Sequence, residues 1–192
     1  MSRIQECIRQ SIETKQKILN DPALLKVIDD VSSACCTAFC NGNKVLFCGN
    51  GGSAADAQHL AAEFSGRFYY DRPPLSSEAL HVNTSYLTAV GNDYSFDEVY
   101  SRLVKGIGKE GDILIGLSTS GNSKNVIRAF EVANEIGMLT VALTGESGGR
   151  MKNAVDFLIN VPSADTPRIQ ESHILIGHII CEIVESSLFP KE

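Results

Sequence analysis

The chain has 192 residues, of which 43% are hydrophobic and 21% are charged, as in an ordinary globular domain and unlike a disordered, collagen-like or rod-shaped chain. Lys and Arg number 17 against 23 Asp and Glu, which gives a net charge of −6. An acidic chain without a basic run is poorly suited to non-specific binding of nucleic acid or of an anionic membrane. We therefore expect neither as a partner, and any bound anion would have to be held by local hydrogen-bond donors.

The first forty residues predict two helices. Ile4, Ile8, Ile12 and Ile18 form one apolar stripe, and Pro22 suits the first turn of the second helix. This stretch is polar and amphipathic and lacks the apolar segment of a signal peptide. Elsewhere no apolar run reaches the ~18 residues that a membrane span requires. We therefore expect a cytoplasmic protein.

After residue 43 apolar runs alternate with helical segments. The runs that predict strands are residues 44–48, 79–82, 112–117, 139–143 and 156–161. The segments that predict helices are residues 54–66, the region around 87, 96–108, a stretch ending near 136, and 168–187. Buried strands that alternate with helices indicate an α/β fold, a three-layer doubly wound sandwich around a five-stranded parallel sheet. Ligands bind such sheets at the carboxyl ends of the strands.

The cysteines of this chain predict structural thiols. They form no C-x-x-C pair, and most of them lie among apolar residues. We expect them to be reduced and buried, with no metal or redox role. They are Cys7, Cys35, Cys36, Cys40, Cys48 and Cys181.

A serine-rich loop, residues 118–123, follows the third predicted strand and precedes a helix. Its sequence, STSGNS, offers four hydroxyl groups within six residues. Together with the free amides of a helix start, such hydroxyls can hold an anion without any Lys or Arg. The loop is not a Walker loop, because no Gly-Lys-Ser/Thr follows it. Phosphate binding is one interpretation, and a serine-rich helix cap and turn is the other.

A glycine-rich loop, residues 49–53, joins the first predicted strand to the helix that follows. Its sequence, GNGGS, permits positive φ angles and a close approach of the backbone to a ligand. A ligand-binding loop and a simple tight turn explain it equally well.

Two helices carry polar side chains whose spacing matters. His59 and Glu63 are four residues apart and share a helix face with Arg67. They could form a metal pair, a catalytic base with its neighbour, or a surface Glu–Arg pair. Gln170 and His178, about two turns apart, interrupt an apolar C-terminal helix, and buried polar groups there need partners. Either a functional site or a satisfied core histidine accounts for His178 alone.

Four segments taken together resemble the phosphoheptose isomerases, a family of sugar isomerase (SIS) domain proteins. They are CGNGGSAADAQHLAAEFSGR (48–67), VGNDY (90–94), GLSTSGNS (116–123) and RIQESHILIGH (168–178). The resemblance covers essentially the whole chain, although the serine-rich loop alone would indicate only a SIS domain. It implies a flavodoxin-like fold, with residues 1–34 as an oligomerisation arm and residues 35–192 as the SIS domain. It also implies a homotetramer with sites between subunits.

The resemblance implies an intramolecular oxidoreductase, an aldose–ketose isomerase that converts D-sedoheptulose 7-phosphate to D-glycero-D-manno-heptose 7-phosphate through an enediol(ate). This is the first step toward activated heptose for lipopolysaccharide core or other surface glycans. Glu63 and His178 would be the acid/base pair, since a carboxylate and an imidazole are suitable proton carriers. Zinc, without an organic cofactor, would be held by His59, Glu63, Gln170 and His178. The implied substrate-binding residues are Asn50, Gly51, Gly52, Ser53, Glu63, Asn92, Asp93, Ser118, Thr119, Ser120, Ser123 and Gln170, of which Ser118, Thr119, Ser120 and Ser123 hold the phosphate.

Two alternatives remain open at this point. A relative of these isomerases, the replication-initiator-associating protein, shares the fold but acts by binding the initiator, and residues 187–190 are somewhat similar to that branch. Gly52, Glu63 and His178 favour the isomerase instead. A sugar-phosphate-sensing module would need the serine-rich loop but not Glu63 or His178, and it usually accompanies a second domain.

Overall fold

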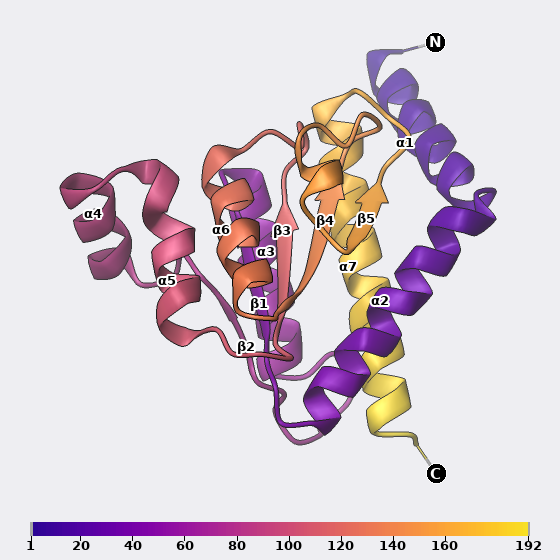
Figure 1. Ribbon diagram of the computed structural model, residues 1–192. Helices are drawn as coiled ribbons and strands as arrows, with labels where there is room; N and C mark the ends of the chain where they lie inside the picture. The colour runs from indigo at the N-terminus through magenta and orange to yellow at the C-terminus, as the bar shows by residue number, and fades with distance from the viewer. Residues whose placement is uncertain (1, 192) are drawn as a thin grey trace.

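The structure is a computed structural model that describes residues 2–191. Within these residues a five-stranded sheet has the strand order β2-β1-β3-β4-β5, and all neighbouring strands are parallel. The predicted doubly wound α/β sandwich is thereby confirmed (Figure 1). The strands are β1 (Val45–Gly49), β2 (Ser77–Ala79), β3 (Ile113–Leu117), β4 (Leu139–Thr144) and β5 (Phe157–Asn160).

Helices cover both faces of the sheet because successive strand residues point to opposite sides. Phe47 and Ile115 pack in the layer of α2, α3 and α7, whereas Leu46 and Leu114 pack in the layer of α5 and α6. Across residues 2–191, each helix is too short or too polar to cross a membrane. The helices are α1 (Arg3–Leu19), α2 (Pro22–Cys40), α3 (Gly52–Ser65), α4 (Thr84–Asp93), α5 (Val99–Ile107), α6 (Lys124–Glu135) and α7 (Thr166–Leu188), with short 3-10 turns η1 (Phe96–Glu98) and η2 (Met151–Asn153).

The second strand lies earlier in the chain than the sequence predicts. It ends at Ala79, which pairs with Phe47, and the apolar run that follows forms a turn. Leu80 is buried, but it belongs to the core of the α5 and α6 layer and does not extend the strand. The apolar run therefore reflected burial in a turn, which short hydrophobic patterns do not distinguish from a strand.

The apolar stripe of α1 is only partly buried. Ile18 packs in the core, but Ile4, Ile8 and Ile12 are 72%, 55% and 60% exposed. Helix α1 contacts α2 and α7, and its buried residues are Thr14 and Ile18. Helix α2 runs without a break through residue 34, the predicted end of the arm, and that division stays a prediction.

The six cysteines are free thiols. Cys35, Cys48 and Cys181 are buried, as predicted, and two others are half-buried. Cys40 is exposed, which corrects the prediction of burial for this residue. It lies at the last residue of α2, where the helix leaves the core.

The buried His173 predicts a loss of stability in acid. Its Nε2 lies 3.1 Å from the Thr144 carbonyl oxygen, and burial lowers the pKa of His173 to about 4. Between pH 6.5 and 4 the unfolded chain therefore binds a proton that the folded chain excludes. We expect the contribution of His173 to the free energy of unfolding to be constant above pH 6.5. It should fall by on the order of 3 kcal/mol by pH 4.

Urea unfolding of wild type and of His173→Leu across this pH range measures the effect. The variant should be less stable at neutral pH but should lack this part of the acid dependence. Equal pH slopes in the two proteins would contradict the assignment.

Candidate active site

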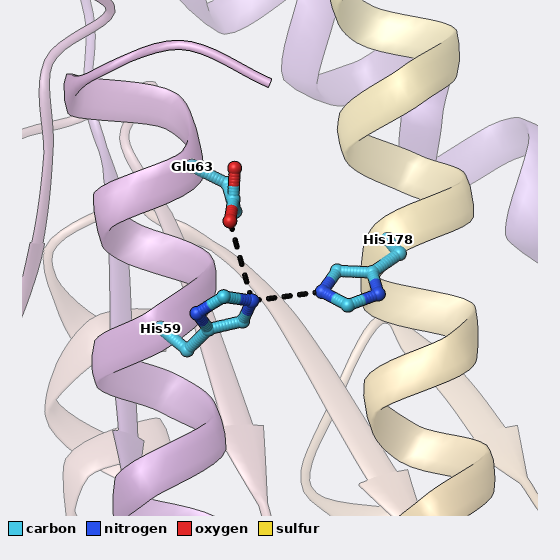
Figure 2. Close-up of side chains that lie close together, drawn as sticks. All are labelled: His59, Glu63 and His178. Carbon is cyan, nitrogen blue, oxygen red and sulfur yellow. Dashed lines mark hydrogen bonds and ion pairs between the residues drawn. The ribbon is translucent and has the colours of Figure 1, made fainter. Parts of the chain in front are cut away.

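Helices α3 and α7 bring three of the predicted site residues together (Figure 2). His59 and Glu63 point from α3 toward His178 on α7. His59 Nε2 lies 2.9 Å from His178 Nε2 and 3.2 Å from Glu63 Oε1. The predicted shared face of His59 and Glu63 is therefore confirmed, and their side chains remain 48% and 21% exposed. The cluster is therefore accessible from solvent.

A glycine allows α3 and α7 to approach at this level. A Cβ atom on Gly177 would lie 2.4 and 2.5 Å from the methyl groups of Leu60. Glycine within a helix costs about 1 kcal/mol relative to alanine, so close packing accounts for its presence here. Because Gly177 immediately precedes His178, this contact sets the spacing at which the imidazole faces α3.

Gln170, the fourth predicted ligand, lies in the first turns of α7 and faces the start of α3. A Cβ atom on Gly52 would lie 2.4 Å from Gln170 Nε2 and 2.7 Å from its Oε1. Only a glycine leaves this amide in place. Gln170 therefore shares the α3–α7 seam with the cluster, about two turns along α7 from His178.

Sequence reasoning missed Asp56 in the same seam. Burial raises the pKa of the Asp56 carboxyl, although a hydrogen bond from Gln170 acts in the opposite direction. Its Oδ2 is buried without a hydrogen-bond partner among the described residues. The sequence does carry a signal for it. Asp56 precedes His59 by three residues and Glu63 by seven, and these spacings place all three side chains on one face of a helix.

The cluster has donors that fit a zinc ion. One nitrogen from each histidine and one oxygen of Glu63 all lie within 4.8 Å of one another. Imidazole nitrogen and carboxylate oxygen are both common zinc ligands. The chemistry and convergence of these side chains are therefore compatible with the predicted metal.

The serine-rich loop lies at the carboxyl end of β3 and leads into α6, as predicted. The hydroxyl groups of Ser118 and Ser123 lie 2.9 Å apart, and Ser118 Oγ lies 3.5 Å from Ser120 Oγ. A cavity of about 300 Å³ beside the loop is lined in part by Thr119 and Ser120. Converging hydroxyls before a helix start suit a phosphate group.

A pair of amides joins the glycine-rich loop to α6. Asn50 Nδ2 donates to Asn125 Oδ1 and Asn125 Nδ2 donates to Asn50 Oδ1, both at 2.9 Å. Asn125 is buried, and its Oδ1 also accepts from the Val126 amide. The orientation of Asn50, a predicted substrate-binding residue, is thus fixed by a residue that sequence reasoning missed.

This amide pair predicts energetic coupling between Asn50 and Asn125. We expect Asn50→Ala and Asn125→Ala each to raise KM for the substrate about 10-fold, as loss of one hydrogen bond to a ligand does. The double variant should be little worse than either single one, because both remove the same oriented amide. Steady-state kinetics of the four proteins test this, with Asn134→Ala at the far end of α6 as control. Additive effects on KM would contradict the coupling.

Asn92 and Asp93 lie apart from the cluster. They end α4, which packs with η1 and α5 in the layer opposite α3 and α7 (Figure 1). Both are exposed, and Asn92 Nδ2 donates to Asp93 Oδ1 at 2.9 Å. Within one chain, the structure does not bring these two predicted substrate-binding residues to His59, Glu63 and His178.

Comparison with known proteins agrees with this geometry. A family model described as SIS domain matches residues 8–145. Phosphoheptose isomerases from Aneurinibacillus thermoaerophilus and Clostridium acetobutylicum are each 54% identical, over 97% and 98% of this chain and 94% and 96% of theirs. The solved phosphoheptose isomerase from Neisseria gonorrhoeae is 44% identical, with a TM-score of 0.90 over 96% of this chain and 97% of its own.

The parallel sandwich, the serine-rich loop and the family match define an enzyme of the SIS-domain class, a sugar-phosphate isomerase. The chain is also more than 50% identical in sequence to phosphoheptose isomerases over nearly its full length, which indicates one family within this class. This chain belongs to the phosphoheptose isomerase family.

Proposed function

We propose that this enzyme converts D-sedoheptulose 7-phosphate to D-glycero-D-manno-heptose 7-phosphate in the cytoplasm, as the first step of activated-heptose synthesis for lipopolysaccharide core or other surface glycans. The observation that carries the proposal is the contact between His178 and the His59–Glu63 pair across α3 and α7. It supplies a carboxylate and an imidazole side by side, in a chain whose relatives are named phosphoheptose isomerases.

The reaction moves a carbonyl group from C2 to C1. Glu63 removes a proton from C1 while His178 donates a proton to the oxygen on C2, which gives the enediol(ate). Glu63 then returns its proton to C2, and His178 takes the proton from the oxygen on C1. The product is the aldose, and both side chains recover their starting protonation states.

The remaining residues bind and orient the substrate or hold zinc. His59, Glu63, Gln170 and His178 would hold the ion, which when bound would polarise the carbonyl and hydroxyl oxygens of the sugar. The hydroxyls of the serine-rich loop would bind the phosphate through neutral donors, as expected for an acidic chain. Asn50, held by Asn125, and the backbone of the glycine-rich loop would contact the sugar chain.

We further propose that the enzyme is a homotetramer whose sites combine residues of different subunits. Ile4, Ile8 and Ile12 expose a continuous apolar stripe on α1, which a second copy of the chain would bury. In their own chain Asn92 and Asp93 lie in the layer opposite the cluster. The Asn92 and Asp93 that contact substrate at a given site would therefore belong to a neighbouring subunit.

A panel of ketose phosphates tests the proposed substrate. Proton NMR should show conversion of sedoheptulose 7-phosphate to an aldose, with much slower turnover of fructose 6-phosphate and ribulose 5-phosphate. Faster turnover of a shorter ketose would replace the proposed substrate. A folded protein that converts none of them would overturn the isomerase function in favour of a binding role.

A further inference from the structure

Beyond the site, α3 and α7 are joined by a buried ion pair. Arg72 Nε lies 3.1 Å from Glu185 Oε1, and each side chain is only 2% exposed. Arg72 follows α3, whereas Glu185 lies on α7 seven residues after His178, two turns along the same side of the helix. The two helices joined by this pair are the two that carry the proposed acid and base.

The Arg72 guanidinium also holds the end of α3. Its Nη2 donates to the carbonyl oxygen of Glu63 itself at 2.8 Å, and its Nη1 donates to those of Phe64 and Gly66 at 2.7 and 3.2 Å. The last carbonyl groups of a helix have no partner within the helix and must be satisfied from outside. Arg72 satisfies them at the turn that carries the proposed base.

The Glu185 carboxylate holds the loop that covers His178. Its two oxygens accept from the backbone amides of Phe68 and Tyr69 at 2.8 and 2.7 Å. The Phe68 ring in turn lies against the His178 imidazole, with ring centroids 5.7 Å apart. One buried carboxylate therefore connects the loop, the aromatic ring on His178 and the helix of His178.

A buried ion pair is weak evidence of stabilisation, because removing both charges from water can cost as much as their attraction returns. Here Arg72 donates to the backbone carbonyl of Glu63, and Glu185 accepts from the backbone amide of Phe68, whose ring lies against His178. A network that contacts both residues in this way fixes the position of Glu63 relative to His178. Acid/base catalysis requires such groups to be held to within about half an ångström.

We propose that Arg72 and Glu185 are positioning residues that set the separation and orientation of Glu63 and His178 for proton transfer. The inference rests on the proposed function for its kinetic consequence, but not for its structural one. The network should act on the chemical step and not on phosphate binding, because the serine-rich loop lies on β3 and α6, outside this network.

The decisive variant is the double replacement Arg72→Met with Glu185→Met, which removes both charges and leaves similar volume. We expect a folded protein whose kcat is about 100-fold lower, the effect of an ångström-scale misplacement, with KM changed by less than about 3-fold. Arg72→Lys keeps the charge without the planar fork and should fall between the double variant and wild type. The matched control replaces another ion pair, Lys44→Met with Asp112→Asn, which joins the amino ends of β1 and β3 and makes its hydrogen bonds outside α3 and α7.

A second measurement does not depend on turnover. The chain has four histidines, so 15N-histidine labelling of metal-free protein reports on each ring. The double variant should move the signals of His59 and His178 and leave those of His81 and His173 in place. Loss of melting temperature with normal kcat and unmoved signals would overturn the proposal, as would an equal loss of kcat in the control. If wild type lacks isomerase activity, the proposed function fails alone, and the histidine signals still decide the positioning role.

Discussion

Replacing Glu63 by Gln, or His178 by Gln, should lower kcat by about 10²- to 10⁴-fold, the range for loss of a positioned general acid or base. In Glu63→Gln, the new amide could occupy the same space as the carboxylate but could not accept the proton from C1. KM should change little, because the phosphate site that we propose, the serine-rich loop, lies on β3 and α6 and not on the helices of Glu63 and His178. A coupled assay with sedoheptulose 7-phosphate measures both constants.

The controls for this experiment are Glu182→Gln and His81→Gln. Glu182 lies on α7 one turn beyond His178 and contacts the Tyr69 hydroxyl, and its replacement should leave kcat within about 3-fold of wild type. Zinc content should be measured for every variant, so that loss of a ligand is separated from loss of a proton carrier. Near-normal kcat in either Glu63→Gln or His178→Gln would remove that residue from the mechanism.

Gly52→Ala should lower activity by about 10- to 100-fold with little loss of stability. The new methyl group would lie 2.4 Å from Gln170 Nε2, and the amide, at the end of a flexible side chain, would move aside. The fold therefore survives, but the amide no longer has the position proposed for zinc and substrate binding. Thermal melting and steady-state kinetics measure the two effects separately.

A double variant identifies the cause. If displacement of Gln170 is responsible, adding Gly52→Ala to Gln170→Ala should produce almost no further loss of activity. Additive losses would mean that the methyl group disturbs the glycine-rich loop itself. A large fall in melting temperature for Gly52→Ala alone would contradict the claim that the amide simply moves.

Local patterns in the sequence predicted the parts of this structure that depend on local physics. Four of the five strands, the two loops at the carboxyl ends of β1 and β3, and the shared face of His59 and Glu63 follow from short-range periodicity, whereas the position of β2 does not. The family resemblance adds Gln170 and His178 to this face. The structure confirms that His178 contacts His59, and it places Gln170 about two turns along α7, against Gly52.

The features that sequence reasoning missed are contacts between distant segments. The local sequence around Arg72 does not indicate an ion pair with Glu185, which lies 113 residues later. The sequence around Asn50 likewise does not indicate a hydrogen bond with Asn125, which lies 75 residues later. Such partners are set by tertiary packing, which a one-dimensional pattern does not contain. Similarly, the isoleucines of α1 predicted a helix but not that three of them face solvent in a single chain.

The most direct test of the account is turnover of sedoheptulose 7-phosphate by one preparation in two states, stripped of metal and reloaded with zinc. We predict conversion to the aldose by the reloaded enzyme, with loss of most activity on stripping and recovery at about one zinc per chain. Full activity without metal would contradict the proposed role of zinc and leave Glu63 and His178 as the whole mechanism. No turnover in either state, from a folded protein, would contradict the central claim that this chain is a sedoheptulose 7-phosphate isomerase.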